Sequence, residues 1–208
     1  MKLDMHVHTK YSPDSYMKIK TLRKICLKLD ITPIITDHNQ IKGNLAYKCP
    51  ILASEISTKE GHIIGYFINE KIKPYLPALE VIEKIHEQGG LACIPHPFDL
   101  VRKKSAIIIQ EIIKKADLIE AFNGRVIKQK YNRMAQAFAR NHKIPMTVGT
   151  DSHFKYEVGK SYIEIEDFNS VKEFIKNIKK GNLFTTPGKP EPLLATYLYK
   201  NSIGRLIK

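Results

Sequence analysis

Short apolar runs alternate with helical patterns along most of the chain. The stretch from Leu3 to Val7 alternates apolar and polar residues with the period of a half-buried strand. The stretch from Lys18 to Leu29 carries apolar residues at the i, i+3, i+4 spacing of an amphipathic helix. Further strands are predicted at 32–36, 51–53, 62–68, 91–94, 117–122 and 145–148, and further helices at 77–88, 105–115, 126–142 and 170–180. Seven short strands, most of them followed by a helix, predict an α/β protein with parallel strands and covering helices.

The ends of these strands distinguish an open doubly wound sheet from a closed barrel. A polar residue able to bind metal falls at or just past the end of five different apolar runs: His8, His38, Glu55, His96 and Asp151. In a parallel barrel such ends converge on one mouth, whereas an open sheet would not bring five of them to one point. An eight-stranded barrel typically takes ~250 residues, so a chain of 208 residues suits seven strands better. We therefore predict a (β/α)7 barrel with a metal site at the C-terminal mouth of its strands.

The composition is that of a globular protein with one domain. Of the 208 residues, 43% are apolar and 26% are charged, and no apolar run approaches the ~18 residues of a membrane span. We expect a single domain over 1–208, with a core of about 2–185 and a C-terminal tail from 186 to 208. The first residues lack the apolar segment of a secretory signal, and the three cysteines form no C-x-x-C pair. These features predict a cytoplasmic protein with reduced thiols and no membrane partner.

The net charge of +13 is compatible with a nucleic-acid partner or an anionic substrate. Of the 34 basic residues, 28 are lysines, and these spread along every segment of the chain. This spread is more typical of lysine-coated helices than of a nucleic-acid interface, and no aromatic-rich basic patch is evident in the sequence. A positive field would still help to gather phosphates.

The placement of the eight histidines indicates a metal site. His6 and His8 share one face of the first strand, and Asp14 follows that strand after a Ser-Pro turn. His86 and His142 sit in predicted helices among polar residues, where a solvated or capping role is expected. The other histidines lie at strand edges beside apolar runs and turn residues: His6, His8, His38, His62, His96 and His153. Histidine pairs also occur on ordinary exposed strands, so it is this shared placement that predicts a metal centre.

Seven ordered motifs make the chain resemble the PHP (polymerase and histidinol phosphatase) family of metal-dependent phosphoesterases. They are His6-x-His8, Asp14, Thr36-Asp37-His38-Asn39, Glu55-Ile56-Ser57, His62-Ile63-Ile64-Gly65, Pro95-His96-Pro97 and Gly149-Thr150-Asp151-Ser152-His153. The stretch from Glu120 to Arg125, followed by Asn132 and Ala135, is similar to a single-domain PHP subgroup. The resemblance covers about residues 2–163.

The resemblance implies a distorted (β/α)7 barrel that holds two to three divalent metal ions (Zn, Mn or Fe) at the C-terminal mouth. It assigns the ligands to three metals: His6, His8, Glu55 and Asp151 to the first; the bridging Glu55 with His62 and His96 to the second; and Asp14, His38 and His153 to the third.

The donor set fits this chemistry without appeal to the family. Neutral imidazoles suit Zn, Fe or Mn, and carboxylates favour the harder Mn and Fe. A bridging carboxylate allows two cations ~3.5–4 Å apart, with a water between them whose pKa falls toward ~7. The resulting hydroxide can attack phosphorus in line without a Ser or Cys nucleophile. Consistent with this, the chain contains neither a G-x-S-x-G motif nor a P-loop.

Further residues are predicted to support the site. Four polar residues are candidates to orient the ligating histidines, with a helix cap or turn as an equally good explanation: Asp37, Asn39, Glu120 and Asn123. Arg102, Lys103 and Arg125 follow strand ends on the mouth side and are candidates to clamp a phosphate. For Lys103, a solvated surface position is the stronger explanation.

We therefore expect a metal-dependent phosphoesterase that hydrolyses a phosphomonoester or a small phosphorylated nucleotide by attack of a metal-bridging hydroxide. The residues expected to carry catalysis are Glu55, Asp151, His153, Arg125 and Arg102. The alternative is a nuclease that trims RNA or short oligonucleotides, because the same kind of site can hydrolyse diesters. A catalytically silent PHP module that regulates a partner is a third reading, but such a module would have lost ligands, and all nine are present. The sequence leaves the oligomeric state open.

Overall fold

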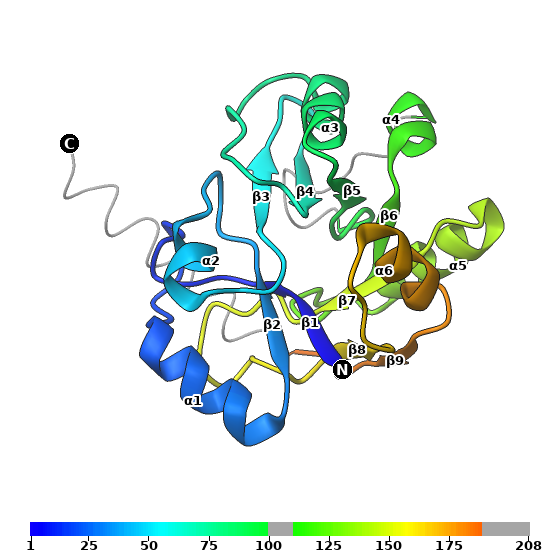
Figure 1. The fold of residues 1–208 in the computed structure, drawn as a ribbon. Helices are drawn as coiled ribbons and strands as arrows, with labels where there is room; N and C mark the ends of the chain where they lie inside the picture. Colours follow the sequence, from blue (N-terminus) through cyan, green and yellow to red (C-terminus); the bar gives the residue numbers. More distant parts are fainter. Residues whose placement is uncertain (100–109, 189–208) are drawn as a thin grey trace.

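The structure, a computed structural model, describes residues 1–99 and 110–188, which form two sheets with helices packed around them (Figure 1). The first sheet has the strand order β2 (Thr32–Ile35), β1 (Lys2–Val7), β8 (Tyr162–Glu164), β9 (Asn182–Phe184). The second has the order β3 (Ala53–Ser57), β4 (His62–Tyr66), β5 (Leu91–Ile94), β6 (Leu118–Asn123), β7 (Met146–Gly149). The predicted α/β class is confirmed. Strand β3 begins later than predicted, so Glu55 lies within it rather than just past its end.

The two sheets meet at the carboxyl ends of their strands through isolated bridges. Val7 pairs with Ser152 beyond β7, and His38 beyond β2 pairs with Glu55 on β3. The backbone N–H of His8 also donates a hydrogen bond to Ser152 O at 2.9 Å. Hydrogen bonding between strands is therefore interrupted at the two places where the sheets meet, which we call the seams. The described residues form two bridged sheets rather than one continuous barrel. The seams lie where the sequence predicts the mouth.

Strand β4 departs from the predicted parallel arrangement. It is antiparallel to both β3 and β5, whereas β5, β6 and β7 run parallel, as do β1 and β2. The cause is the short connection between β3 and β4, in which Thr58 Oγ1 accepts hydrogen bonds from the backbone N–H groups of Glu60 and Gly61. Such a hairpin joins antiparallel strands, because a parallel pair needs a crossover of a dozen or more residues.

Most helices lie where the sequence predicts them. The described helices are α1 (Ile19–Leu29), α2 (Lys42–Tyr47), α3 (Ala78–Glu87), α4 (Gln110–Lys115), α5 (Lys130–His142) and α6 (Val171–Ile178). Helix α2 and the strands β8 and β9 were not predicted, because they are too short to show a period. Helix α5 begins later than predicted, because Asn123 Oδ1 accepts the backbone N–H of Arg125 at 2.9 Å and holds that segment in a turn. The first part of the helix predicted at 105–115, and the tail beyond residue 188, lie outside the described residues.

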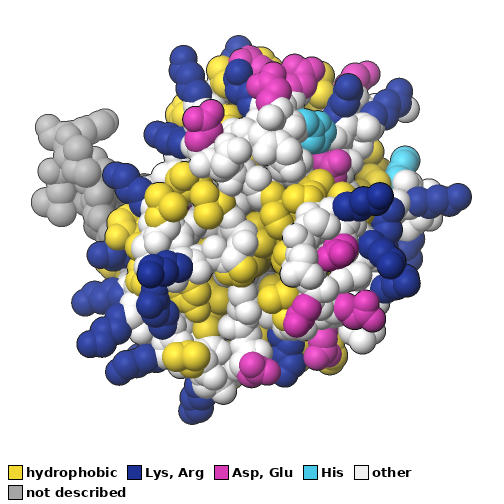
Figure 2. All heavy atoms as spheres, viewed as in Figure 1, with side chains coloured by type: hydrophobic (Ala, Val, Ile, Leu, Met, Phe, Trp, Pro, Cys, Tyr) yellow, Lys and Arg dark blue, Asp and Glu magenta, His cyan; other side chains and the backbone are white. Residues whose placement is uncertain are grey.

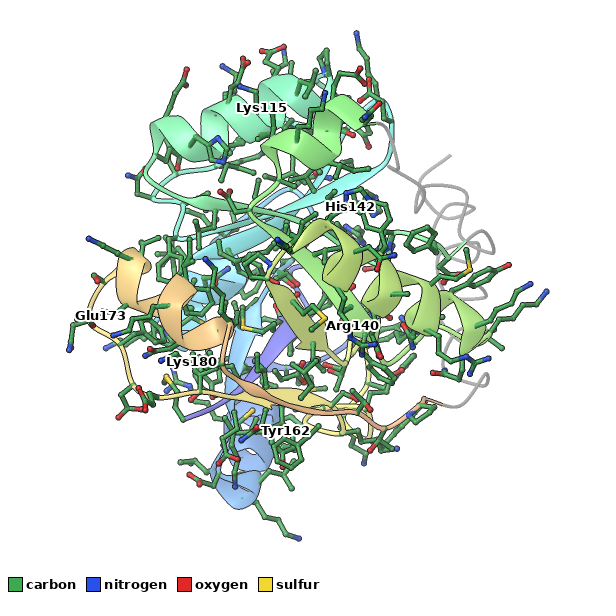
Figure 3. All side chains as sticks on the ribbon, turned by 90° about the vertical axis from the view of Figure 1, so that its right-hand side faces the viewer. Lys115, Arg140, His142, Tyr162, Glu173 and Lys180 are labelled. Carbon is green, nitrogen blue, oxygen red and sulfur yellow. The ribbon has the colours of Figure 1, made fainter. Side chains whose placement is uncertain are left out.

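The apolar core fills the space between the sheets and beneath the helices. One cluster joins residues of both sheets and of α6, among them Leu3, Ile64 and Phe174. Across it, Tyr66 OH donates a hydrogen bond to Met5 O at 2.9 Å. Helices α4, α5 and α6 cover the side of the molecule that faces the viewer in Figure 3. This packing supports the strands below their carboxyl ends.

The surface carries its positive charge as the sequence predicts. Lysine and arginine side chains spread around the margin of the face shown in Figure 2, together with acidic side chains. None of the helices in residues 1–99 and 110–188 combines the length and the apolar character needed to cross a membrane.

Candidate metal centre

His6 and His8, at the carboxyl end of β1, point to the same side of the sheet. Both side chains are fully buried, and their Nε2 atoms lie 3.1 Å apart. The two-residue period of the strand brings them together, as predicted. Asp151, in the loop after β7, faces the pair, with its Oδ1 3.6 Å from His6 Nε2 and 3.3 Å from His8 Nε2.

Glu55 lies at the centre of the cluster. Its Oε1 is 3.0 Å from His62 Nδ1 and 3.1 Å from His96 Nε2. Its Oε2 is 3.2–3.5 Å from nitrogen atoms of three further histidines: His6, His8 and His38. Burial by itself would raise the pKa of Glu55, but the surrounding histidines hold that pKa well below its usual range. The carboxylate is therefore charged and is shared between two groups of histidines, which is the position a bridging ligand requires.

A second group of donors surrounds Asp14. Its Oδ1 lies 3.4 Å from His153 Nε2, and its Oδ2 lies 3.3 Å from His38 Nε2. Burial and the nearby Arg125 guanidinium lower the pKa of His153 to about 3, against the opposite effect of Asp14. The His153 imidazole is therefore neutral near pH ~7 and able to bind a metal.

All nine side chains predicted as ligands thus meet in one cluster. Three sets have donor atoms within 4.8 Å of one another: His8, Asp14, His38 and His153; His6, His8 and Glu55; and His38, Glu55 and His62. Asp151 and His96 join these sets through the contacts given above. His38 belongs to two sets, with Nδ1 toward Glu55 and Nε2 toward Asp14, whereas the resemblance assigns it to the third metal alone.

Hydrogen bonds at the edge of the cluster determine which ring nitrogen faces inward. His6 Nδ1 lies 2.9 Å from Glu120 Oε1, and His153 Nδ1 lies 2.8 Å from Asp151 O. A carboxylate and a carbonyl only accept hydrogen bonds, so both Nδ1 atoms carry a proton. In both rings, Nε2 is the nitrogen left to bind a metal.

Ser12 contacts three of the donor residues: Asp14, His38 and His8. Its hydroxyl donates to Asp14 Oδ1 at 3.0 Å, accepts the backbone N–H of His38 at 3.2 Å, and lies 3.2 Å from His8 Nδ1. Since the hydroxyl proton is directed at the carboxylate, His8 Nδ1 is the donor and its Nε2 is left for a metal. The sequence pattern did not reveal this role, because Ser12-Pro13 is sufficiently explained as a turn.

The electrostatics of the cluster and its buried ring nitrogens fit bound cations. Burial lowers the pKa of His8, but hydrogen bonds to Asp151 and Glu55 raise it to about 9, so the cluster attracts positive charge. Within residues 1–99 and 110–188, three buried ring nitrogens at the cluster make no well-directed hydrogen bond: His38 Nδ1 and His62 Nδ1, which contact the Glu55 carboxylate, and His96 Nδ1. Imidazole together with carboxylate suits Zn, Fe and Mn. The residues present are therefore able to hold divalent metals.

Two of the four predicted supporting residues contact predicted metal ligands directly. Glu120, besides holding His6, accepts the backbone N–H of His96 at 2.8 Å and the side-chain amide of Asn123 at 2.9 Å through its Oε2. The same Asn123 amide donates to Asp151 Oδ2 at 3.2 Å. Glu120 and Asn123 therefore link donors from three strand ends.

The other two, Asp37 and Asn39, position backbone rather than histidine rings. Asp37 accepts the N–H and the hydroxyl of Thr9, both at 2.6 Å. Asn39 Oδ1 accepts the backbone N–H of Ser57 at 2.7 Å. Asp37 thus ties the end of β1 to the end of β2, and Asn39 ties the end of β2 to β3. They hold the strand ends that carry the donors.

Of the two arginines predicted to bind a phosphate, only Arg125 lies within the described residues. Arg102 lies outside the described residues. Arg125 is only 5% exposed, and its Nε lies 3.2 Å from Glu157 Oε1. The Oε2 of Glu157 accepts the backbone N–H groups of His153 and Phe154 at 2.8 and 2.9 Å, so the ion pair anchors the loop that carries His153. Glu157 was not predicted, because it lies in a stretch without periodicity.

The fold and the site define a class of protein: a mixed α/β protein whose strand ends carry a buried cluster of histidines and carboxylates suited to divalent metals. A family model described as PHP-associated matches residues 129–183. An uncharacterized protein of Methanocaldococcus jannaschii is 36% identical over 211 residues, which cover 91% of this chain and 87% of that protein. The chain belongs to the PHP family, as its motifs predict.

Solved structures share the fold. One is a two-domain protein from Bacteroides vulgatus that contains a predicted PHP-like metal-dependent phosphoesterase. It superposes with a TM-score of 0.70 at 14% identity, and the match covers 96% of this chain and 69% of that protein's chain. A lesion-specific endonuclease from Pyrococcus furiosus superposes with a TM-score of 0.59 at 16% identity. The match covers 91% of this chain and 59% of the endonuclease chain. At these identities the likeness establishes the fold alone.

Proposed function

We propose that the protein is a metal-dependent phosphoesterase that hydrolyses a phosphomonoester or a small phosphorylated nucleotide. The observation that carries this proposal is the position of Glu55, a buried carboxylate within 3.5 Å of nitrogen atoms of five histidines. Such a donor set suits two or more divalent cations that share one ligand. The fold shared with a predicted PHP-like phosphoesterase supports the reaction class.

The proposed ligands form three sets around this carboxylate: His6, His8, Glu55 and Asp151; Glu55, His62 and His96; and Asp14, His38 and His153. Bound cations of this kind supply Lewis-acid charge to a phosphate and lower the pKa of a water. The chain's own residues keep the donors ready. Glu120 leaves His6 Nε2 directed inward, and Ser12 does the same for His8. Arg125 and Arg102 are proposed to contact the substrate phosphate.

We also propose that the chain is one PHP domain, with a core of about 2–185 and a tail from 186 to 208. The two seams join β2 to β3 and β1 to the end of β7. Passing across both seams, the strands follow the order β1 to β7 around the site. This order supports a distorted (β/α)7 barrel with β8 and β9 added at the edge of β1.

Purified protein is expected to carry about two to three equivalents of divalent transition metal, because nine donors exceed the roughly four to six that one ion takes. Elemental analysis after reconstitution with Zn, Mn or Fe measures this. A matched control is His86→Ala: His86 lies on helix α3, pairs with Asp117 and should leave the metal content unchanged when replaced, whereas His6→Ala should lower it. Less than one equivalent in the unaltered protein would contradict the metal centre.

A nuclease is the second candidate. The net charge of +13 favours it, and the fold is shared with the lesion-specific endonuclease from Pyrococcus furiosus. Both functions use the same donor cluster, so they differ in how many phosphates the protein contacts outside it.

For a small phosphorylated substrate we expect kcat/KM to depend only weakly on salt, as for about one or two ionic contacts. A single-stranded nucleic acid that contacts several phosphates loses affinity with a log–log salt slope of about −0.7 per contact. The measurement is kcat/KM for a small phosphomonoester between about 50 and 200 mM salt, with a short oligonucleotide as competitor. Tight competition with a steep slope would replace the small-substrate proposal by the nuclease.

A further inference from the structure

Two loops beside the donor cluster lie against each other, one after β1 and one after β7. The hydroxyl of Ser15 contacts both His8 O and His153 O, each at 3.1 Å. His153 Nε2 also reaches Asp14 Oδ1 at 3.4 Å. The residues next to these contacts, in particular Tyr16 of the first loop, are therefore close to the second loop and to the cluster, although Ser15 and His153 are 138 residues apart in sequence.

Both loops carry aromatic side chains near the surface, which we call the aromatic rim: Tyr11, Tyr16, Phe154 and Tyr156. Tyr16 is 53% exposed and Tyr156 is 50% exposed. The rings of Phe154 and Tyr156 stack with their centroids 5.7 Å apart and their planes within 5°. The Lys10 ammonium lies 5.1 Å from the centroid of the half-buried Tyr11 ring. The rim is thus a set of flat, partly exposed rings beside the cluster.

The exposed charges of these two loops, 9–18 and 150–161, are all positive. The exposed charged residues are lysines: Lys10, Lys18, Lys155 and Lys160. The acidic residues in the same ranges are all buried: Asp14, Asp151 and Glu157. A molecule that approaches the rim therefore meets aromatic rings and lysines, while the carboxylates face inward to the cluster and to Arg125.

We propose that the aromatic rim binds the nucleobase of a nucleotidyl substrate whose phosphate lies in the donor cluster. Aromatic side chains stack on any base, and surrounding lysines attract the phosphates. The rim is adjacent to the donors, because Phe154 directly follows His153 and Tyr16 lies two residues after Asp14. This inference rests on the proposed function, which brings the phosphate to the cluster. A free nucleotide and the end of a single-stranded nucleic acid share this chemistry.

The test compares two phosphonates, in which a carbon–phosphorus bond replaces the ester so that neither is cleaved: the 5′-phosphonate analogue of adenosine monophosphate, and methylphosphonate. Binding to the full-length, metal-reconstituted protein is measured by calorimetry. The nucleoside phosphonate is expected to bind about fivefold to 100-fold more tightly, the effect of stacking one base. Tyr16→Ala with Tyr156→Ala should remove most of this preference, and the corresponding Tyr→Phe pair should retain it.

The matched control is Leu27→Ala, which removes a strongly exposed apolar side chain on α1 and should leave the preference unchanged. Methylphosphonate should bind all variants equally. Equal affinity of the unaltered protein for both phosphonates, or a preference that survives in the double Ala variant, would overturn the proposal. The protein could also prefer the nucleoside phosphonate through its tyrosines and yet cleave no phosphoester with Zn, Mn or Fe. That result would support base binding at the aromatic rim and reject the proposed function.

A third arm separates the two sources of the nucleobase. A single-stranded oligonucleotide of about eight residues is used to displace the nucleoside phosphonate at several salt concentrations. Weak displacement identifies the ligand as a free nucleotide. Tight displacement that falls steeply with salt identifies it as the end of a nucleic-acid chain.

Discussion

Replacement of Glu55 by glutamine is expected to lower kcat/KM for a phosphomonoester by at least about 100-fold. Loss of a group that only orients a metal ligand already costs about 10–100-fold, and Glu55 contacts five histidines itself. An amide of the same size removes the negative charge, so it cannot balance the charge of two cations. Steady-state kinetics measure the loss in activity, and elemental analysis should show a parallel loss of metal.

His142→Ala is the control for this variant. His142 is exposed at the end of α5 and lies against Phe138, with ring centroids 4.2 Å apart and ring planes tilted by 30°. Its removal should leave kcat/KM and the metal content close to those of the unaltered protein. If both variants lost activity to the same extent, the reaction would have to take place outside the cluster around Glu55.

Truncation of Arg125 to alanine is expected to lower the free energy of unfolding by about 3–5 kcal/mol, the usual cost of breaking a buried ion pair. Arg125 Nε lies 3.2 Å from Glu157 Oε1, and both side chains are buried. The variant would leave the Glu157 carboxylate buried without its guanidinium. Urea denaturation measures the loss. The double variant with Glu157→Gln should recover part of it, whereas a loss below about 1 kcal/mol would indicate a solvated pair.

The same variants separate two roles of Arg125. If its guanidinium binds the substrate phosphate, Arg125→Ala raises KM for a small phosphomonoester about tenfold, the size of one lost charge-assisted hydrogen bond. Glu157→Gln keeps the guanidinium and should change KM little. Equal changes in KM would mean that Arg125 acts only through the loop that carries His153, which Glu157 anchors.

The donors of the cluster could be predicted because their positions follow from local pattern. His6 and His8 share a face for the simple reason that side chains alternate along a strand. His38, His96 and Asp151 follow short apolar runs, and their side chains meet in the cluster around Glu55 and His8. Each of these positions could be predicted without knowing which atoms the side chain contacts in the folded protein.

The groups that orient the donors could not be predicted in the same way. Ser12 and Glu157 act through hydrogen bonds to His8, His38 and His153, and no periodicity marks a residue for such contacts. The aromatic rim is a similar case, because it combines two loops that are distant in the sequence. The chain read in order therefore shows no basic aromatic patch, although the folded molecule brings the two loops that carry these tyrosines and lysines into contact.

Local pattern alone was sufficient for the α/β class, for most strands and helices, and for the set of residues that could bind metal, because these depend on periodicity and on residue type. The separation of the strands into two bridged sheets, the ring nitrogen that each histidine presents and the burial of Arg125 against Glu157 emerged only in the folded molecule. They depend on hydrogen bonds and ion pairs between segments that the fold brings together, and such pairings leave no trace in the order of the residues.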